Sequence, residues 1–311
     1  MMRTIAGGLA GIALACVVAH AQGFELRTEQ VAEDVYALFG PTGPRTRENF
    51  GLNANYGVIV TDAGVVLVDS GTSAAAAKVL EAQVAKITAK RVRWVLNTGS
   101  QDHRWLGNAY FAGKGAEIVA LRRTAATQRE VGRQQLDQLA PVLGDQVNAV
   151  PPMTAPRPLE GDRVELDLGG RRVQLLWLGD AHFPGDAVVW LPQERVAFAG
   201  DIVFTDRLLG VLPSSRVRSW LEAFAAVMSL APRLIVPGHG SVSDIAKAQR
   251  DTGDYLRWLI ASLAPLASEL QGVGIAVGNF GDAPQFSRLL NYELLHKANI
   301  NRAYLQFESG Q

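Results

Sequence analysis

Aspartate and histidine side chains recur along this chain in short loops of small residues, each placed directly after an apolar run. In chain order these loops supply Asp102, His103, His182, Asp201 and His239. Imidazole nitrogens and carboxylate oxygens are the donors that proteins offer to Zn²⁺, Fe²⁺ and Mn²⁺. Because loops at the ends of neighbouring strands can face one cleft, the pattern predicts a metal site.

Four of these residues form the predicted metal site: Asp102, His103, Asp201 and His239. Two carboxylates in one cleft repel each other unless a cation compensates their charge. A divalent ion with two imidazole and two carboxylate ligands is electrically neutral, which favours zinc, with iron or manganese as alternatives. His296, in contrast, lies in an apolar helical pattern and is predicted to be a surface or packing residue.

The first half of the chain alternates between strand and helix signals, and these elements must position the loops. Short β-branched or apolar runs predict strands at residues 25–28, 35–38, 55–61, 65–69, 93–96 and 117–120. Apolar positions at helical spacing predict helices at 74–87, directly after His103, and at 124–139.

The second half repeats this composition after a proline-rich crossing at residues 150–158. It has strand-like runs at 163–168, 173–177, 187–191 and 195–199, a helix at 216–228 and a strand at 234–236. Two similar β-rich halves with interleaved helices predict an αββα four-layer sandwich over residues 22–240. Residues 241–311 are mostly helical in pattern and are expected to pack on the same domain as an extension.

The N-terminus has the features of a secretory signal peptide. Arg3 precedes an apolar stretch at residues 5–18, and Ala19-His20-Ala21 predicts cleavage after Ala21. The apolar stretch is too short for stable membrane insertion, so a periplasmic or secreted protein is expected. Cys16 is the only cysteine and lies in this segment; Ala13 stands where a lipidation motif usually places leucine, which argues against lipidation. A mature chain without cysteine must build a metal site from histidine and carboxylate.

The overall composition limits the partners. Lys and Arg total 30, and Asp and Glu also total 30, so the formal charge is zero and no basic excess indicates nucleic acid. A small-molecule substrate is the expected partner. Four apolar residues near the loops either wall the predicted cleft or belong to the core: Phe204, Leu208, Leu209 and Trp220.

Taken together, the motifs resemble those of the metallo-β-lactamase-fold hydrolases, over about residues 31–240. The resemblance rests on the hairpin around Asn55-Tyr56-Gly57-Val58-Ile59-Val60 and on Asp102-His103, Leu178-Gly179-Asp180-Ala181-His182, Ala199-Gly200-Asp201 and Pro237-Gly238-His239-Gly240. The family's first motif reads His-x-His-x-Asp-His, and aligning it on Asp102-His103 places Thr98 and Ser100 at its first two histidines. The resemblance then implies one complete metal site (Asp102, His103, Asp201 and His239) and one vacated site that keeps only His182 and Asp201.

The resemblance implies metal-assisted hydrolysis, with Asp102 and His182 as catalytic residues. His182, free of a ligand role, would accept a proton from the metal-bound water or orient the substrate. Asp69 resembles a family residue that supports the metal loops. The substrate class stays open among esters, thioesters, lactones, lactams and phosphodiesters. The alternative is a catalytically impaired binding or accessory protein, because loss of two ligands is also what decay of an active site produces.

Overall fold

The computed structural model describes residues 24–147 and 151–310. The expected signal peptide, the cleavage position after Ala21 and Cys16 lie outside the described residues. Among the described helices, none combines the length and the apolar character needed to cross a membrane.

The described strands form two sheets, and the strands of each sheet are neighbours in chain order. The first sheet has the order β1-β2-β3-β4-β5-β6, with bounds Arg27–Ala32, Val35–Phe39, Asn55–Thr61, Gly64–Val68, Val92–Leu96 and Glu117–Val119. The second has the order β11-β10-β9-β8-β7, with β7 Arg163–Asp167, β8 Arg172–Leu176, β9 Val188–Leu191, β10 Val196–Phe198 and β11 Leu234–Val236. Both sheets mix antiparallel hairpins with parallel pairs at β4–β5, β5–β6 and β10–β11.

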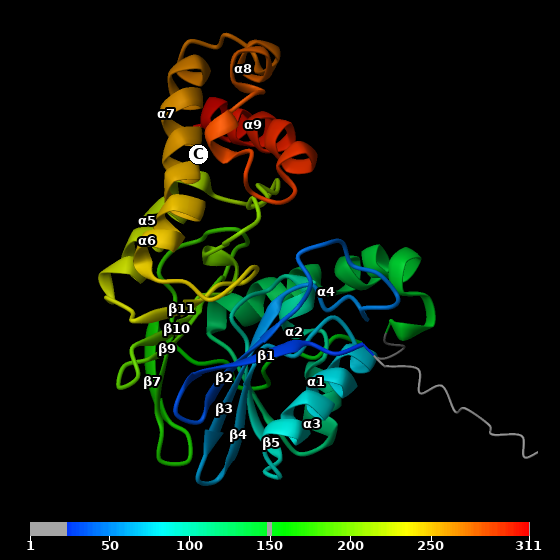
Figure 1. Cartoon of the computed structure of the whole chain (residues 1–311). Coiled ribbons are helices and arrows are strands. Elements are labelled where there is room, and N and C mark those ends of the chain that lie inside the picture. The colour runs from blue at the N-terminus through cyan, green and yellow to red at the C-terminus, as the bar shows by residue number, and fades with distance from the viewer. Residues whose placement is uncertain (1–23, 148–150, 311) are drawn as a thin grey trace, which may run out of the picture.

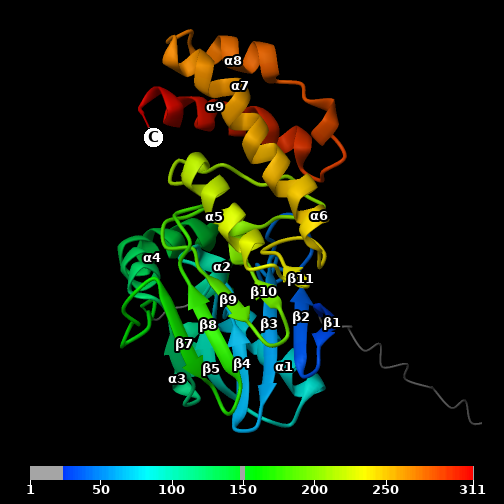
Figure 2. The same cartoon turned by 90° about the vertical axis from the view of Figure 1, so that its left-hand side faces the viewer.

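Strand alternation places the sheets face to face (Figure 2). In β3, Val58 packs with helix residues on the outer face, whereas its neighbour Ile59 packs between the two sheets. Successive side chains of a strand point to opposite faces, so a strand buried on both sides reads as a continuous apolar run. Helices α1 Ala74–Ile87 and α3 Asn108–Gly113 cover the first sheet, and α5 Val217–Ser229 covers the second. The predicted αββα sandwich is confirmed.

Three helices lie over one end of the sandwich, as Figures 1 and 2 show: α7 Asp254–Ser268, α8 Val273–Phe280 and α9 Tyr292–Glu308. The short helix α6 Ile245–Ala248 precedes them in the chain, and α4 Arg122–Leu143 lies beside the first sheet. Tyr255 and Leu259 of α7 share one apolar cluster with Trp220 and Phe224 of α5. The helical extension is therefore continuous with the core beneath the second sheet.

The segment that carries the first site motif differs from the expected helix after His103. His103 itself lies inside a single helical turn, α2 Asp102–Trp105, and α3 starts only at Asn108. Gly107 separates the two helices and lies against the loop that follows β4. Its amide donates to the carbonyl of Gly71 at 2.9 Å, and a Cβ added to it would stand 2.0 Å from the carbonyl oxygen of Ser70. This close backbone contact positions α2 over the strand ends.

Gly107→Ala is therefore expected to destabilise the protein by about 1–3 kcal/mol or more, because the added methyl meets backbone that cannot rotate away. Gly113→Ala is the matched control, since Gly113 is exposed and a methyl group added there would have no atom within 4 Å. That control should stay within about 0.5 kcal/mol of the parent. Urea unfolding of both variants measures the difference, and equal stabilities would contradict this account of the α2 position.

Candidate functional site

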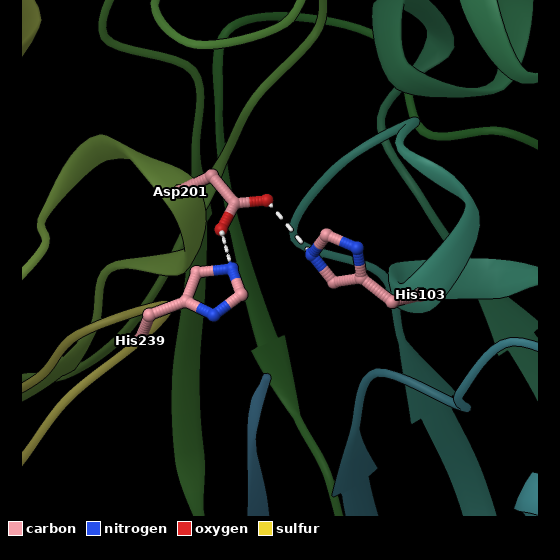
Figure 3. A group of neighbouring side chains, drawn as sticks. All are labelled: His103, Asp201 and His239. Atoms are coloured by element: carbon pink, nitrogen blue, oxygen red, sulfur yellow. Dashed lines mark hydrogen bonds and ion pairs between the residues drawn. The ribbon is translucent and has the colours of Figure 1, made fainter. Parts of the chain in front are cut away.

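Three buried side chains meet where the two sheets end: His103 of α2, Asp201 after β10 and His239 after β11 (Figure 3). The carboxylate of Asp201 lies between the two rings. His103 Nε2 is 3.1 Å from Asp201 Oδ2, and His239 Nε2 is 3.3 Å from Asp201 Oδ1. One donor atom from each residue lies within 4.8 Å of the other two. The structure thus brings together three of the four predicted metal ligands.

Asp102, the fourth predicted ligand, is not part of this three-donor group. Its Oδ2 accepts from Arg45 Nη1 at 2.5 Å, and its Oδ1 accepts from the backbone amide of His103 at 2.6 Å. Burial opposes its charge, but Arg45 and His103 hold the pKa of Asp102 at about 2. The carboxylate therefore anchors Arg45 beside the cluster.

A second arginine, Arg104, ties the cluster to the rest of the fold. Its Nε and Nη2 donate to the two oxygens of Asp201 at 3.1 and 2.5 Å, and its Nη1 donates to Asp69 Oδ2 at 3.1 Å. Nη1 and Nη2 also reach the carbonyls of Asn55 and Gly238 at 3.0 and 3.2 Å. Burial works against the charge of Asp201, but Arg104 and His103 keep its pKa well below the usual range.

Thr98 and Ser100, which the sequence alignment places at the first two motif histidines, hydrogen-bond to groups outside the donor cluster. Thr98 Oγ1 donates to Asp69 Oδ2 at 2.6 Å, and Ser100 Oγ donates to the carbonyl of Pro184 at 2.6 Å. Asp69 also accepts from the Thr98 amide at 2.7 Å, so it braces the loop after β5 as well as Arg104. The side chain that meets His182 is Gln101, whose Oε1 accepts from His182 Nε2 at 3.0 Å.

His182 lies beside the cluster in a mostly aromatic environment. Its ring centroid is 5.5 Å from that of Phe204 and 5.3 Å from that of Trp220. Burial lowers the pKa of His182 to about 4, so the ring is neutral at neutral pH. With Nε2 donating to Gln101, the lone pair is on Nδ1, which is buried and has no hydrogen-bond partner among the described residues.

The four residues of the expected apolar wall belong to the core, and two of them, Phe204 and Trp220, also contact site histidines. Leu208, Leu209 and Trp220 are fully buried, and Trp220 Nε1 donates to the carbonyl of Ile202. Phe204 is 2% exposed and its ring stacks on His239 at 5.1 Å. His296 lies far along the chain in α9, is buried, and bonds Tyr255 and the carbonyl of Phe280, as expected for a packing residue.

The donor set fits one divalent metal ion. His239 Nδ1 donates to the carbonyl of Asn53 at 2.8 Å, which leaves the Nε2 lone pair directed at Asp201. His103 Nδ1 lies 2.8 Å from Arg45 Nη2, which can only donate, so Nδ1 accepts and Nε2 carries the proton that points to Asp201 Oδ2; an ion bound there would replace that proton. A remote nitrogen that donates to a carbonyl, as in His239, is typical of metal-binding histidines. Two imidazoles and one carboxylate with a position left open match a catalytic zinc site.

The sequence predicts that a metal cation is needed to compensate the carboxylates of the site, but in the structure arginine side chains already pair with them. Three carboxylates lie at or beside the cluster: Asp69, Asp102 and Asp201. Arg45 and Arg104 already compensate them in part, and a third guanidinium, Arg207, approaches His239 Nδ1 at 3.3 Å. The carboxylates therefore do not by themselves require a metal ion, and the case for one rests on the direction of the imidazole nitrogens.

Sequence reasoning missed Gln101, Arg45, Arg104 and Arg207. Gln101 and Arg104 flank Asp102-His103 in the same motif, so a comparison of alternative motif frames could have found them. Arg45 and Arg207 come from loops without any periodic pattern, and no signal in the sequence marks them.

Comparison with known proteins agrees with this architecture. The family model described as metallo-beta-lactamase superfamily matches residues 50–239. The alpha subunit of 2,4-dinitroanisole O-demethylase from Nocardioides sp. (strain JS1661) is 26% identical over 261 residues, covering 80% of this chain and 73% of that protein. A metallo-beta-lactamase type 2 from Bacillus cereus is 27% identical over 191 residues, covering 60% and 67%. The solved metallo-beta-lactamase from Pontibacter korlensis shares the fold, with a TM-score of 0.61 and 18% identity over 75% of this chain and 99% of that chain.

The buried neutral state of His182 predicts a pH effect on stability. Its folded pKa lies below the unfolded value of 6.5, so the unfolded chain binds a proton first as the pH falls. The free energy of unfolding should therefore decrease between pH 6.5 and about 4, by roughly 3 kcal/mol from this group. Urea unfolding of metal-free protein measures it, and His182→Gln should lessen the slope. Burial also lowers the pKa of His239, so the variant should keep the part of the pH slope that His239 contributes. Parallel slopes in the two proteins would contradict a buried neutral His182.

Proposed function

Because the chain belongs to the metallo-beta-lactamase superfamily, we propose that it is an exported hydrolase that uses a single divalent metal ion, zinc first, with iron or manganese as alternatives. The observation that carries the proposal is the convergence of His103, Asp201 and His239 on one centre. Export is inferred from residues 1–21 alone, and a mature N-terminus at Gln22 is the expected sign of it.

The proposal includes a different frame for the first motif, one residue later than the sequence suggested. In this frame Gly99 and Gln101 stand at the two histidine positions, His103 at the aspartate and Arg104 at the last histidine. Three contacts support it: Gln101 faces His182, and both His103 and Arg104 face Asp201. Thr98 and Ser100 bond elsewhere. The single-site conclusion is unchanged, because an amide oxygen is a poor zinc ligand.

The residues divide the chemistry among them. A metal ion held by His103, Asp201 and His239 would lower the pKa of a bound water towards about 7 and polarise the scissile bond. His182 Nδ1 has a free lone pair that accepts a hydrogen bond from water or substrate, while Gln101 fixes the tautomer that leaves it free. Because burial lowers the pKa of His182 to about 4, its role is to orient the substrate or water and not to take up a proton. Asp102 holds Arg45, which donates to His103 Nδ1, so the role of Asp102 here is to orient a ligand through Arg45.

The substrate is a small molecule with a hydrolysable bond: an ester, thioester, lactone, lactam or phosphodiester. The O-demethylase relative adds aryl methyl ethers, with 2,4-dinitroanisole as the first compound for the screen. One observation favours the alternative of a binding or accessory protein, namely that Arg104 already satisfies both oxygens of Asp201 without an ion.

Elemental analysis of the purified mature chain should find about one metal ion per chain. His239→Ala should abolish both metal binding and hydrolysis, because it removes one of the three donors. His296→Gln is the matched control, a buried histidine outside the cluster, and should retain the metal. Two firmly bound ions would contradict the single-site proposal. No ion, together with a folded protein, would favour the accessory alternative.

The motif frame has its own test. The double variant Gly99→His and Gln101→His should bind a second metal ion next to His182, because Gln101 already touches that ring. A Cβ added to Gly99 would have open space apart from Asp186 Oδ1 at 3.0 Å and Arg104 Cγ at 3.4 Å. Thr98→His with Ser100→His is the control and should not raise the metal content. Calorimetric zinc titration decides between the frames; a gain only in the control pair would favour the original one.

A further inference from the structure

The backbone of Phe204 is held along both of its edges, by an extended segment on one edge and by a single side chain on the other. On the first edge Phe204 lies opposite His239 as in a parallel sheet, and the Thr205 amide donates to the carbonyl of His239 at 3.0 Å. On the second edge the hydroxyl of Thr252 takes the place of a strand. It accepts from the Phe204 amide at 2.9 Å and donates to the Phe204 carbonyl at 2.5 Å. One side chain therefore satisfies both backbone groups of Phe204.

The contact between Thr252 and Phe204 is shielded from water. Thr252 is fully buried, and Phe204 is 2% exposed. A buried backbone N–H or C=O that loses its partner carries the cost of its desolvation. Valine has nearly the shape of threonine but lacks the hydroxyl. Thr252→Val would therefore leave both groups of Phe204 without this partner, and the segment around Phe204 would have to move.

Thr252 belongs to a π-helical turn, Gln249–Gly253, at the junction between the sandwich and the helical extension (Figure 1). Two consecutive buried side chains of this turn reach the segment that follows β10. Thr252 binds the backbone of Phe204, and Asp251 Oδ2 accepts from the Asp206 amide at 3.0 Å. π-Helical turns are rare and are frequently found at functional sites. The turn thus fixes the backbone beside the donor cluster.

The ring of Phe204 connects this fixed backbone to His239. The two rings are stacked, with centroids 5.1 Å apart and planes inclined by 18°. His239 Nδ1 also donates to the carbonyl of Asn53 at 2.8 Å. The hydrogen bond sets the direction of the imidazole edge, and the stacked ring sets the plane of the imidazole. Contacts that orient a metal ligand in this way tune its affinity for the ion.

We propose that Thr252 is a positioning residue for His239. Its hydroxyl fixes the backbone of Phe204, and the Phe204 ring fixes the plane of the His239 imidazole. The inference rests on the proposed function, because it takes His239 to be a metal ligand. Through Thr252 the helical extension becomes part of the metal centre, although none of the three donors belongs to it.

The test is the zinc affinity of the full-length mature chain, measured by competition with a chromophoric chelator. Thr252→Val should weaken zinc binding by about tenfold or more, which is the loss that removal of a contact behind a metal ligand typically causes. Thr252→Ser should bind zinc like the parent, because serine keeps a hydroxyl that both accepts and donates. This rescue separates the effect of the hydroxyl from that of the side-chain volume.

Thr61→Val is the matched control. Thr61 is a buried threonine whose hydroxyl also donates to a backbone carbonyl, that of Gly64, at 2.8 Å. It lies at the far end of β3 from Asn55, whose carbonyl accepts from Arg104. Thr61→Val should keep the zinc affinity of the parent. Urea unfolding of metal-free protein should show that both valine variants are destabilised, so destabilisation alone cannot explain a loss of affinity confined to Thr252→Val.

A second readout needs no metal ion. The stacked Phe204 ring shifts the NMR signals of the His239 ring protons, which are assigned by their loss in His239→Ala. In metal-free protein Thr252→Val should move these signals, whereas Thr252→Ser and Thr61→Val should leave them in place. If Thr252→Val does not fold, Phe204→Leu takes its place. That variant keeps the backbone bonds to Thr252 but removes the ring, and it should weaken zinc binding to a similar extent.

Four results would overturn the inference. The first is a zinc affinity or a set of His239 signals in Thr252→Val that matches the parent, and the second is an equal loss of affinity in Thr61→Val. The third is failure of Thr252→Ser to restore binding, and the fourth is parent-like affinity in Phe204→Leu. Failure of the proposed function looks different: a parent chain that binds no zinc contradicts the metal site, while the His239 signals of metal-free protein still decide the role of Thr252.

Discussion

The guanidinium of Arg104 lies between two buried carboxylates, Asp69 and Asp201, and the rest of the site depends on this contact. Asp69 follows β4 and Asp201 follows β10, so one side chain joins the ends of both sheets. Removing one partner of such a buried ion pair typically costs about 3–5 kcal/mol, because the other charge is left without compensation. The same contact orients the Asp201 carboxylate between His103 and His239. Arg104 therefore both stabilises the contact between the two sheets and orients the carboxylate of Asp201.

Two arginines, Arg104 and Arg45, lie beside the proposed metal site without occupying the position of the ion. Arg104 and the two imidazoles share the oxygens of Asp201: Oδ2 is contacted by Arg104 Nε and His103 Nε2, and Oδ1 by Arg104 Nη2 and His239 Nε2. Arg45 draws Asp102 away from the cluster, which leaves three donors and an open position. At the neighbouring position, Gln101 and His182 bond each other, so that position is filled by a hydrogen bond between uncharged side chains.

The layered fold followed from the sequence because local signals and packing agree. The helix expected at residues 74–87 is α1 Ala74–Ile87, whose start is fixed by Ser73 accepting from the Ala76 amide. The edge strand β1 begins at Arg27 and not at the predicted residue 25, because Arg27–Ala32 is polar, mostly exposed and without the apolar alternation that marks a strand. The site was harder to predict. Motif spacing identified His103, Asp201 and His239, but a one-residue choice of frame decides whether Asp102 joins His103 at the centre, and only the turn of α2 settles a side-chain direction. Arg45 and Arg207 join the site through tertiary contacts that no local pattern records.

Anomalous X-ray diffraction at the zinc absorption edge, from crystals of the mature chain grown with zinc, tests the central claim most directly. We predict a single anomalous peak at bonding distance from His103 Nε2, Asp201 and His239 Nε2, with Arg104 still bonded to Asp201. A peak between Gln101 and His182, a peak bound by Asp102, or no peak at the three-donor cluster would contradict it.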